Sequence, residues 1–447
     1  MERDRGSKRA EGDSSGRLRK RLDFERSTDR RTDAGRALGL ERMKALMRAL
    51  DDPQLACRVV HVAGSKGKGS VCEMVAAAAQ GCGCVAGLYT SPHLVDLRER
   101  IRVGGRMISE SGFVAALTEV ERADACLPES LRPVTHFEAV TAAAFMYFRS
   151  RAVDVAVIET GMGGLLDATN VVRPDISLIA SIQMEHADVL GQTLAEIARH
   201  KAGIIKPHTP AATVPQAAEV LAVLRHAAES ADAPLAVVGE ESLIRVERSS
   251  AAGTSRLMIR AARGWFGPFT CPLPGEHQMM NTALALAGLE RLRETGLPIT
   301  ADGVSRGLAK TPRRGRMELI ARSPRVVVDG AHTPDSIRAL LAALPKEFPH
   351  DSLLVVFGCS HDKDAGGMLD ALCRAADKVI LAAASGGRAM PVEVLRALCH
   401  DGVGAEVQSS RDVVSAVRAA RSAASADDVV LVTGSFAVAG EAKSAVA

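Results

Sequence analysis

Aromatic residues are scarce in this sequence: they make up 3% of 447 residues, with a single tryptophan. A surface that stacks nucleic-acid bases depends on aromatic side chains, so such a surface is poorly supported. The formal net charge is only +3, far from the strongly basic balance of a nucleic-acid-binding domain. No apolar run reaches the roughly 18 residues that a membrane-spanning helix requires. We therefore expect neither a nucleic-acid nor a membrane partner.

Paired cysteine motifs are also lacking. The 9 cysteines are scattered, and Cys82 and Cys84 form a lone C-x-C without the paired C-x-x-C modules of a zinc site. An odd number of cysteines without a secretory segment indicates reduced thiols, and hence the cytoplasm. Hydrophobic content of 47% and charge of 24% are typical of a soluble globular protein. The length allows two or three domains.

The N-terminal 33 residues are dominated by charges and contain almost no aliphatic side chains. Such a segment cannot bury a core, so we expect a mobile charged tail over residues 1–35. A basic nucleic-acid arm and an upstream start-codon artefact are the alternatives. The segment lacks the apolar stretch of a signal peptide.

Strand-like and helix-like patterns alternate through the rest of the chain. Strands are predicted within residues 59–63, 86–93, 153–164 and 175–182, and helices within residues 38–50, 71–80, 136–151 and 193–204. Alternation of this kind predicts a mostly parallel α/β sheet of the phosphate-loop type. Residues 243–275 predict a small β insertion, followed by a helix at 277–292.

A second, smaller Rossmann-like α/β series follows, with strands expected within residues 325–332, 353–359, 378–383 and 429–436. Pro, Gly and Arg cluster near residues 311–315, where we expect the hinge between two domains. The predicted domains are residues 36–311 and residues 312–447.

The segment "HVAGSKGKGS", residues 61–70, is a near match to a phosphate-binding loop. The usual pattern G-x-x-x-x-G-K-[ST] holds phosphate with backbone amides, a Lys and a hydroxyl. Here Gly69 separates Lys68 from Ser70, and Val62 occupies the first glycine position. A predicted strand precedes the loop and a predicted helix follows it, so a helix N-terminus would face an anion. A glycine turn required only by packing is the alternative, but it leaves the loop lysine with little structural use.

Polar side chains also follow the predicted strands of the first domain. Ser91, Glu159 and His186 each come at or just after a strand end, which is where ligands bind in parallel α/β sheets. With Ser70 they provide two hydroxyls, a carboxylate and an imidazole, and oxygen ligands together with phosphate oxygens suit Mg²⁺. Each residue alone is more readily explained as a cap or a local hydrogen-bonding group. Their combination beside a phosphate loop favours a metal–nucleotide site.

Eight motifs resemble, in order and spacing, those of the folylpolyglutamate synthase/dihydrofolate synthase family, ADP-forming ligases of the Mur ligase-like superfamily. They are "HVAGSKGKGS", "GLYTSPHLVDLRERIRV", "ETGMGGLLDATN", "LPGEHQMMNTALAL", "GRMELI", "VVVDGAHTPDSI", "GCSHDKD" and "VTGSFAVAGE". The phosphate loop of that family has the extra glycine found here. The resemblance implies an ATP- and folate-binding domain over residues 36–311 and a glutamate-ligase domain over residues 312–447. We also expect a monomer.

The resemblance implies roles for individual residues. ATP binding is assigned to Gly67, Lys68, Gly69, Ser70, Asn281, Arg316 and Asp329. One or two Mg²⁺ ions are assigned to Ser70, Ser91, Glu159, His186 and Lys201, the last matching a lysine that is often carbamylated. Substrate binding is assigned to Leu38, Gly39, Leu40, Phe137, Glu138, Gly161 and Ser435. The residues nearest the reaction would be Lys68, Lys201 and His332.

The residues themselves leave plainer alternatives open. Lys201 reads as a lysine on a solvated helix face, and Asn281 as a helix amide with local hydrogen bonds. Asp329 and His332 could belong to an ordinary strand-end turn. The substrate-binding segments "LGLERM" and "THFE" read equally as an amphipathic helix and a helix start.

This set of residues suits amide formation through an acyl phosphate. ATP would convert a carboxylate into a good electrophile, and the amine of L-glutamate would then displace phosphate, with Lys68, the loop amides and Mg²⁺ offsetting the developing charge. The acid would be dihydropteroate, a reduced folate, or both in turn.

Four positions depart from the family pattern: Leu165 for Arg, Glu185 for Asp, Thr333 for Asn, and Ala437 for His or Tyr. They bear on folate specificity, glutamate chain length and rate. Two rivals are a Mur-type peptidoglycan-precursor ligase and an ATP-driven switch without ligase activity. The first would carry a further N-terminal domain, for which the roughly 30 globular residues before the loop are too few. A degenerate ATP-binding homologue is a third alternative.

Overall fold

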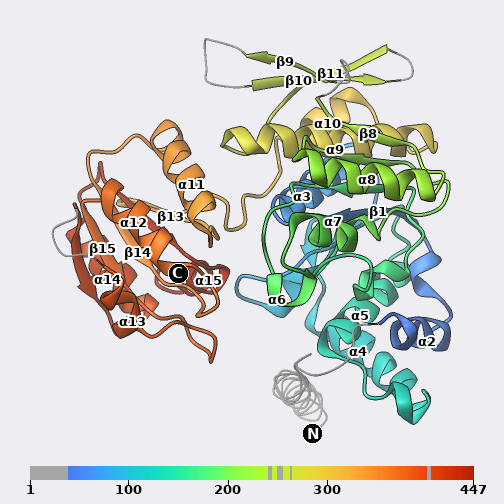
Figure 1. Cartoon of the computed structure of the whole chain (residues 1–447), viewed down its shortest axis with the longest axis horizontal. Helices are drawn as coiled ribbons and strands as arrows, with labels where there is room; N and C mark the ends of the chain where they lie inside the picture. Colours follow the sequence, from blue (N-terminus) through green and yellow to red (C-terminus); the bar gives the residue numbers. More distant parts are fainter. Residues whose placement is uncertain (1–38, 240–243, 249–254, 262–263, 400–403, 447) are drawn as a thin grey trace, which may run out of the picture. The chain divides into compact units, whose positions relative to one another are not determined.

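The computed structural model describes residues 39–239, 244–248, 255–261, 264–399 and 404–446. The predicted tail over residues 1–35 and the predicted substrate residue Leu38 lie outside these ranges. The described chain forms two compact units (Figure 1). The larger one contains the chain up to Ser91, Arg98–Pro272 and Met279–Thr311, and the smaller one contains Pro92–Leu97, Leu273–Gln278 and the chain from Pro312. Two short segments from within the first predicted domain therefore belong to the smaller unit.

The larger unit is built on an 8-stranded sheet in the order β4-β3-β2-β5-β1-β6-β7-β8. The strands are β1 (Arg58–Ala63), β2 (Ala86–Tyr89), β3 (Ile101–Val103), β4 (Arg106–Met107), β5 (Val155–Glu159), β6 (Ile176–Ile179), β7 (Ala211–Thr213) and β8 (Leu235–Val237). All neighbours from β2 to β8 are parallel, whereas β3 and β4 add an antiparallel edge. Every residue of β5 and β6 is buried, as expected of parallel strands covered on both faces.

Helices flank this sheet (Figure 1). They are α2 (Glu41–Ala49), α3 (Lys68–Gly81), α4 (Glu110–Ala125), α5 (His136–Ser150), α6 (Ala187–Leu190), α7 (Leu194–Ala202), α8 (Ala218–Ser230), α9 (Glu276–Glu294) and α10 (Ala301–Leu308). Short 3-10 turns are η1 (Pro53–Leu55), η2 (Leu97–Arg100), η3 (Glu129–Leu131) and η4 (Ala168–Val171). The predicted insertion is confirmed as an antiparallel 3-stranded sheet of β9 (Ile244–Arg248), β10 (Ser255–Ala261) and β11 (Gly264–Thr270).

Helix α3, which follows the glycine loop, packs with its backbone against α10. A Cβ added at Gly307 would overlap the Ala77 carbonyl oxygen, and one at Gly81 would overlap the Gly303 carbonyl oxygen. Glycine is required here because two backbones approach closely. This contact fixes α3, and with it the start of the helix that carries Lys68 and Ser70.

The smaller unit has a 6-stranded sheet in the order β12-β13-β17-β14-β15-β16. Its elements are β12 (Glu318–Arg322), β13 (Arg325–Val328), β14 (Leu353–Phe357), β15 (Lys378–Leu381), β16 (Glu406–Ser409), β17 (Val429–Thr433), α11 (Pro334–Glu347), α12 (Ala365–Ala375), α13 (Val392–Ala397), α14 (Val413–Ala423) and α15 (Phe436–Lys443). Only β12 pairs antiparallel.

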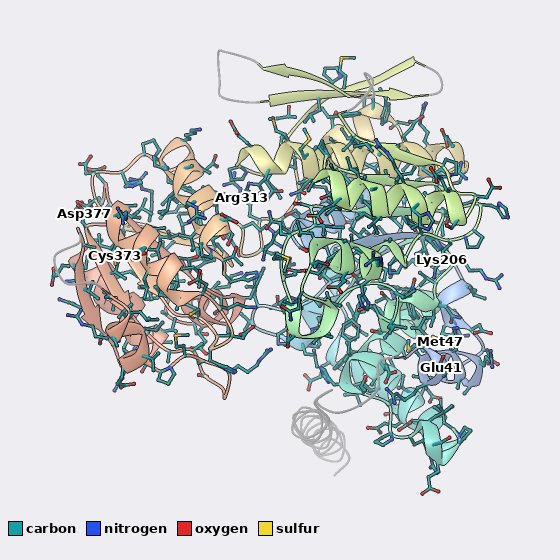
Figure 2. The ribbon with its side chains drawn as sticks, in the orientation of Figure 1. Glu41, Met47, Lys206, Arg313, Cys373 and Asp377 are labelled. Carbon is teal, nitrogen blue, oxygen red and sulfur yellow. The ribbon has the colours of Figure 1, made fainter. Side chains whose placement is uncertain are left out.

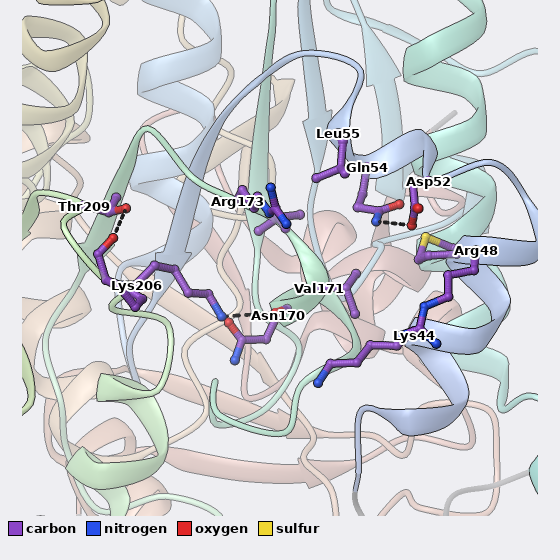
Figure 3. Close-up of a pocket in the computed structure, with 13 residues that line it drawn as sticks. Lys44, Arg48, Asp52, Gln54, Leu55, Asn170, Val171, Arg173, Lys206 and Thr209 are labelled. Atoms are coloured by element: carbon purple, nitrogen blue, oxygen red, sulfur yellow. Dashed lines mark hydrogen bonds between the residues drawn. The ribbon is translucent and has the colours of Figure 1, made fainter.

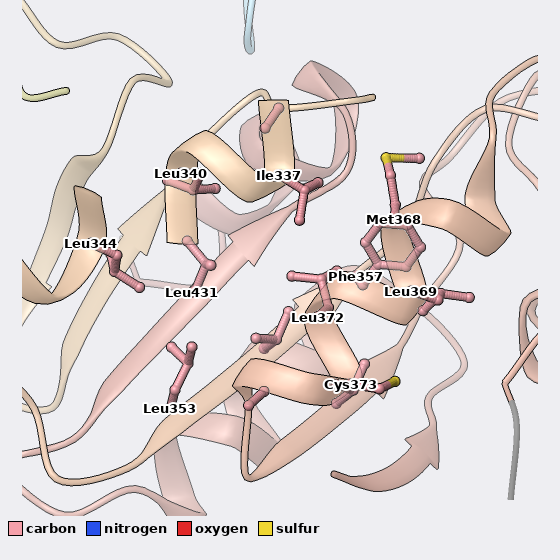
Figure 4. Close-up of a cluster of buried hydrophobic side chains, with 14 of the residues drawn as sticks. Ile337, Leu340, Leu344, Leu353, Phe357, Met368, Leu369, Leu372, Cys373 and Leu431 are labelled. Carbon is pink, nitrogen blue, oxygen red and sulfur yellow. The ribbon is translucent and has the colours of Figure 1, made fainter. Parts of the chain in front are cut away.

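Alternate strand residues of the smaller unit enter two separate apolar cores. Val355 and Leu431 belong to one core (Figure 4), whereas Val356 and Val430 belong to the other. The sheet is therefore covered on both faces, and the predicted pair of α/β folds is confirmed. No helix in the described ranges has the length and apolarity needed to cross a bilayer.

Candidate active site

The glycine turn joins β1 to α3 at the carboxyl edge of the parallel sheet. Gly64 and Gly67 have φ of +149° and +92°, values that favour glycine. A Cβ at Gly64 would lie 2.8 Å from the Ala180 Cβ, and one at Gly67 would overlap the Asn281 side-chain oxygen. Packing therefore explains both glycines, and the predicted ATP-binding residue Asn281 lies against the turn.

Lysines converge on the backbone of this turn. Lys68 Nζ and Lys201 Nζ each donate a hydrogen bond to the Gly64 carbonyl oxygen, both at 2.9 Å. Lys201 also pairs with Glu185 at 3.2 Å, and Lys66 Nζ lies 3.9 Å from the other oxygen of that carboxylate. The turn is thus a strongly positive site with a single carboxylate among these lysines.

The charges of this cluster shift one another's pKa values. Burial, followed by repulsion from Lys68, lowers the pKa of Lys201 to about 8, although Glu185 opposes the shift. Burial raises the pKa of Glu185, but the field of Lys68, Lys201 and Lys66 outweighs it and holds the pKa below its ordinary value. Lys201 is 1% exposed, so the reading of a solvated surface lysine is wrong.

Ser91 and Glu159 meet where β2 and β5 end. The Ser91 backbone N–H donates to the Glu159 carboxylate at 3.1 Å, and Glu159 is buried. Ser70 is buried in the first turns of α3. His186 follows Glu185 directly, with φ of +50°, a conformation that is uncommon outside glycine and often found at functional sites.

The donor set fits magnesium better than a metal that prefers nitrogen or sulfur. In the described ranges no group of three or more His, Cys, Asp or Glu side chains is placed to hold a metal. A buried carboxylate and hydroxyls beside a phosphate loop match a cation that takes most of its oxygens from phosphate and water. Ligation by Ser70, Ser91, Glu159, His186 and Lys201 together stays a prediction.

Two predicted substrate segments are linked by an ion pair. The Glu138 carboxylate accepts hydrogen bonds from Arg42 Nε and from the Thr135 backbone N–H, both at 2.7 Å, and Glu138 completes a capping box at the start of α5. The helix-start reading of "THFE" is therefore correct, and its binding of substrate stays a prediction. Leu40 immediately precedes α2, and Gly39 precedes Leu40.

Phe137 covers Gly161. A Cβ at Gly161 would lie 2.5 Å from the Phe137 ring, and the centroids of Phe137 and Tyr89 are 6.1 Å apart. The glycine therefore lets an aromatic ring approach the segment after β5. Leu165 further along this segment is 45% exposed, and its backbone N–H bonds the His200 carbonyl at 2.7 Å. Contact of these side chains with substrate stays a prediction.

The smaller unit places its predicted residues around the end of β13. Asp329 accepts hydrogen bonds from the backbone N–H groups of Met317 and Ala331, both at 2.8 Å. Burial raises the pKa of Asp329, and Arg316 opposes the shift. The Arg316 guanidinium lies 5.2 Å from the centroid of the Phe436 ring, a cation–π contact.

His332 and Ser435 occupy turns that begin helices. His332 Nδ1 lies 2.8 Å from the Gly330 carbonyl oxygen, so that nitrogen donates. Thr333 is the N-cap of α11 and forms a capping box with Ser336, and Ser435 caps α15. His332 therefore does belong to a strand-end turn, as the plainer alternative states. The roles of His332 near the reaction and of Ser435 in glutamate binding stay predictions.

Sequence reasoning missed two charged residues of the larger unit. Lys66 pairs with Glu185, and its presence inside the glycine loop was the available signal. Arg100 interacts with Tyr89 and Glu159, and burial lowers its pKa. Arg100 lies within the motif "GLYTSPHLVDLRERIRV", but its interactions were not predictable, because its partners become neighbours only in the folded sheet.

Two domain models cover most of the chain. Residues 62–289 match the Mur ligase middle domain, and residues 315–436 match the glutamate ligase domain of Mur ligases. Together with the positive glycine turn and the two α/β sheets, these matches define a ligase of the Mur class.

The relatives narrow this class. A probable bifunctional folylpolyglutamate synthase/dihydropteroate synthase of Haloferax volcanii is 37% identical over 91% of this chain and 48% of that protein, so the chain spans about half of that relative. A dihydrofolate synthase/folylpolyglutamate synthase of Mycobacterium tuberculosis is 35% identical over 90% of this chain and 89% of that protein.

Solved structures agree with the relatives. The Mycobacterium tuberculosis folylpolyglutamate synthase complexed with ADP has a TM-score of 0.87 at 34% identity, covering 96% of this chain and 98% of that chain. A bifunctional folylpolyglutamate synthase/dihydrofolate synthase with Mn, AMPPNP and L-glutamate bound has a TM-score of 0.80 at 28% identity, covering 92% and 94%. This chain belongs to the folylpolyglutamate synthase/dihydrofolate synthase family. The comparisons support an ADP-forming ligase and do not favour the peptidoglycan alternative.

Proposed function

We propose that this protein uses ATP to ligate L-glutamate to dihydropteroate, to a reduced folate, or to both, releasing ADP and phosphate. The observation that carries the proposal is the convergence of Lys68 and Lys201 on the Gly64 carbonyl, in the turn that leads from β1 into α3. A cluster of cations at a helix N-terminus suits the phosphates of a nucleotide. The relatives with bound ADP, AMPPNP and L-glutamate support the same reading.

The reaction requires two displacements. A carboxylate oxygen of the folate acid attacks the γ-phosphorus of ATP, the bond to the β–γ bridging oxygen breaks, and ADP leaves. The amine of L-glutamate then attacks the acyl carbon, the C–O bond to phosphate breaks, and the amine loses a proton. Lys68 and the loop amides would stabilise charge on the transferred phosphoryl group, which is where most of the rate enhancement of phosphoryl transfer arises.

A divalent cation would supply further charge stabilisation, held by Glu159 and the hydroxyls of Ser70 and Ser91 with His186 nearby. Carbamylation of Lys201, which requires the neutral amine, is consistent with its lowered pKa of about 8. Before carbamylation, the Lys201 ammonium would stay paired with Glu185. Mass spectrometry of the intact protein in bicarbonate would detect the added carboxyl group.

In the smaller unit, Asp329 and Arg316 would contact ATP, His332 would lie near the reacting groups, and Ser435 would lie near L-glutamate. In the larger unit, Phe137, Glu138, Gly161 and the Gly39–Leu40 segment would form the folate side. We also propose a monomer in the cytoplasm. Light scattering of the purified protein tests the monomer, and fractionation of the source cells tests the compartment.

The decisive experiment measures phosphate release with MgATP and L-glutamate, adding dihydropteroate or tetrahydrofolate in separate reactions and identifying products by mass spectrometry. We expect turnover with at least one acid, and a loss of about 100-fold or more in kcat for Lys68→Ala. Lys310→Ala, which removes an exposed lysine of the same unit, is the matched control.

Turnover with both acids would establish the bifunctional reading and make Leu165 and Thr333 tolerated variations. Turnover with tetrahydrofolate alone would remove dihydropteroate as a substrate. A folded protein that binds ATP but turns over neither acid would refute the folate assignment and favour the degenerate homologue.

A further inference from the structure

The larger unit has a pocket at the end of its sheet where the parallel strands begin, away from the glycine turn. The pocket has a volume of about 560 Å³ and is lined by α2, η1, the segment from η4 towards β6, and the turn before β7 (Figure 3). Arg173 precedes β6 and Lys206 precedes β7, whereas the glycine turn follows β1. Because these strands are parallel, the pocket and the candidate active site occupy opposite ends of the strands.

The lining of this pocket is strongly basic. Lys44, Arg48, Arg173 and Lys206 line it, and the only acidic lining residue is Asp52. The Asp52 carboxylate already accepts a hydrogen bond from Gln54 at 2.9 Å. Across the part of the chain that the structure describes, Lys44, Arg48 and Arg173 take part in no ion pair. The pocket therefore has an excess of positive charge that a bound anion would neutralise.

Two buried amides belong to residues of the lining, but their oxygens are covered. Gln54 and Asn170 are 6% and 5% exposed, and in the described structure Gln54 Oε1 and Asn170 Oδ1 accept no hydrogen bond. The Asn170 amide nitrogen donates to the carbonyls of Leu165 and Gly203, which fixes the orientation of its side chain. Because both oxygens are inaccessible to solvent, the exposed cations and not these amides would contact a ligand in the pocket.

The remaining lining suits a small organic molecule. Met47, Leu55, Val171 and Val172 supply apolar surface, and the volume lies within the range of small-molecule sites. Lys206 donates to the Asn170 carbonyl at 3.2 Å, and in Figure 3 its side chain extends towards Asn170. Met47 and Lys206 are also labelled in Figure 2. Burial and the charge of Lys44 lower the pKa of Lys206 to about 8, and a bound anion would reverse that shift.

We propose that this pocket binds a small organic anion that carries phosphate or carboxylate groups, at a site separate from the phosphate loop. The cations would pair with the anionic groups, and the apolar lining would contact the organic part of the molecule. The proposal does not depend on ligase activity.

Calorimetric titration of the full chain tests this site. MgADP is kept in excess, so that heat from the phosphate loop is removed, and the probes are O-phosphoserine, γ-linked triglutamate and pyrophosphate, which lacks an organic part. We expect binding of phosphoserine or triglutamate, weakened at least about fivefold by Lys44→Gln/Arg173→Gln. Arg151→Gln/Lys310→Gln removes the same charge at exposed positions outside the pocket and should change binding by less than about twofold.

Preference for phosphoserine would assign phosphate as the anionic group, and preference for triglutamate would assign carboxylates. Absence of binding for both up to about 10 mM would overturn the proposal, as would equal weakening in the two double variants. Tighter binding of pyrophosphate than of either other probe would overturn the proposal that the ligand is an organic anion. Circular dichroism of each variant verifies folding, and the comparison between the double variants holds whether or not the chain turns over folates.

Discussion

At the scale of single residues, His61 is a titratable group held away from water. It lies in the middle of β1, is fully buried, and its Nε2 lies 2.9 Å from Thr169 Oγ1. Burial, followed by repulsion from Lys206, lowers its pKa from the ordinary 6.5 to about 3. Between these values the unfolded chain binds a proton that the folded chain does not. The contribution of the neutral His61 to the free energy of unfolding is therefore complete above pH 6.5 and is lost as pH falls towards 3.

We therefore expect the free energy of unfolding to fall by about 2 kcal/mol more in the unaltered protein than in His61→Gln between pH 6 and pH 4.5. Glutamine keeps a hydrogen-bonding group near Thr169 but does not titrate. Urea unfolding at several pH values measures the difference. Parallel pH profiles for the two proteins would contradict the buried neutral imidazole.

Lys201 shows what a sequence can and cannot predict at this scale. Its position on a helix was predictable, but its burial was not, because its partners are distant in sequence. The Gly64 carbonyl is 137 positions away and Glu185 is 16 positions away. Lys68, in contrast, was predicted to lie at the glycine turn from its immediate neighbours, and there it bonds Gly64, 4 positions away.

At the scale of elements, Thr333 begins α11 through a capping box with Ser336. Asparagine, the usual family residue, is an equally good N-cap, whereas alanine cannot accept the hydrogen bond. We expect Thr333→Ala to lower the free energy of unfolding of the smaller unit by about 1 kcal/mol, and Thr333→Asn to be nearly neutral. Urea unfolding followed by circular dichroism distinguishes them, and equal losses would show that capping is unimportant here.

The close contact of α3 with α10 carries a second prediction. Gly307→Ala would force the backbones of the two helices apart, so we expect a loss of about 1–3 kcal/mol in the stability of the larger unit. Gly366→Ala is the control, since a Cβ at this position in α12 meets nothing closer than 3.9 Å; it should be neutral or slightly stabilising. Thermal unfolding measures both, and a neutral Gly307→Ala would disprove the tight packing.

The sequence predicted most strands of the parallel sheets, because strands such as β5 and β14 are continuous apolar runs. It did not predict α10, which contains Gly303 and Gly307 and so reads locally as a turn. These glycines make structural sense only beside α3, and local propensity holds no information about that partner. The antiparallel edge strands β3 and β4 are 3 and 2 residues long, too short to give a pattern.

At the scale of the whole molecule, the smaller unit includes Pro92–Leu97 as well as the chain from Pro312. Leu94 packs on one of its cores, and a Cβ at Gly440 would overlap the Leu94 carbonyl. We expect a fragment of residues 312–447 to unfold at a lower urea concentration than the same unit in the full chain. Identical transitions would contradict a structural role for the segment.

Substitutions in the full chain provide a matched pair. Leu94→Ala should lower the free energy of unfolding of the smaller unit by about 1–2 kcal/mol, since it removes partly buried apolar surface. Val95→Ala, at a side chain that is 58% exposed, should change it by less than about 0.5 kcal/mol.

The chain enters the smaller unit twice, at Pro92–Leu97 and Leu273–Gln278, before it crosses into that unit for the last time between Thr311 and Pro312. A single proteolytic cut at that last crossing would not release two independent domains. The first fragment would still hold two pieces of the smaller unit, folded into it as parts of its structure. Such a cut would turn the chain into two noncovalently associated fragments that separate only when the smaller unit unfolds.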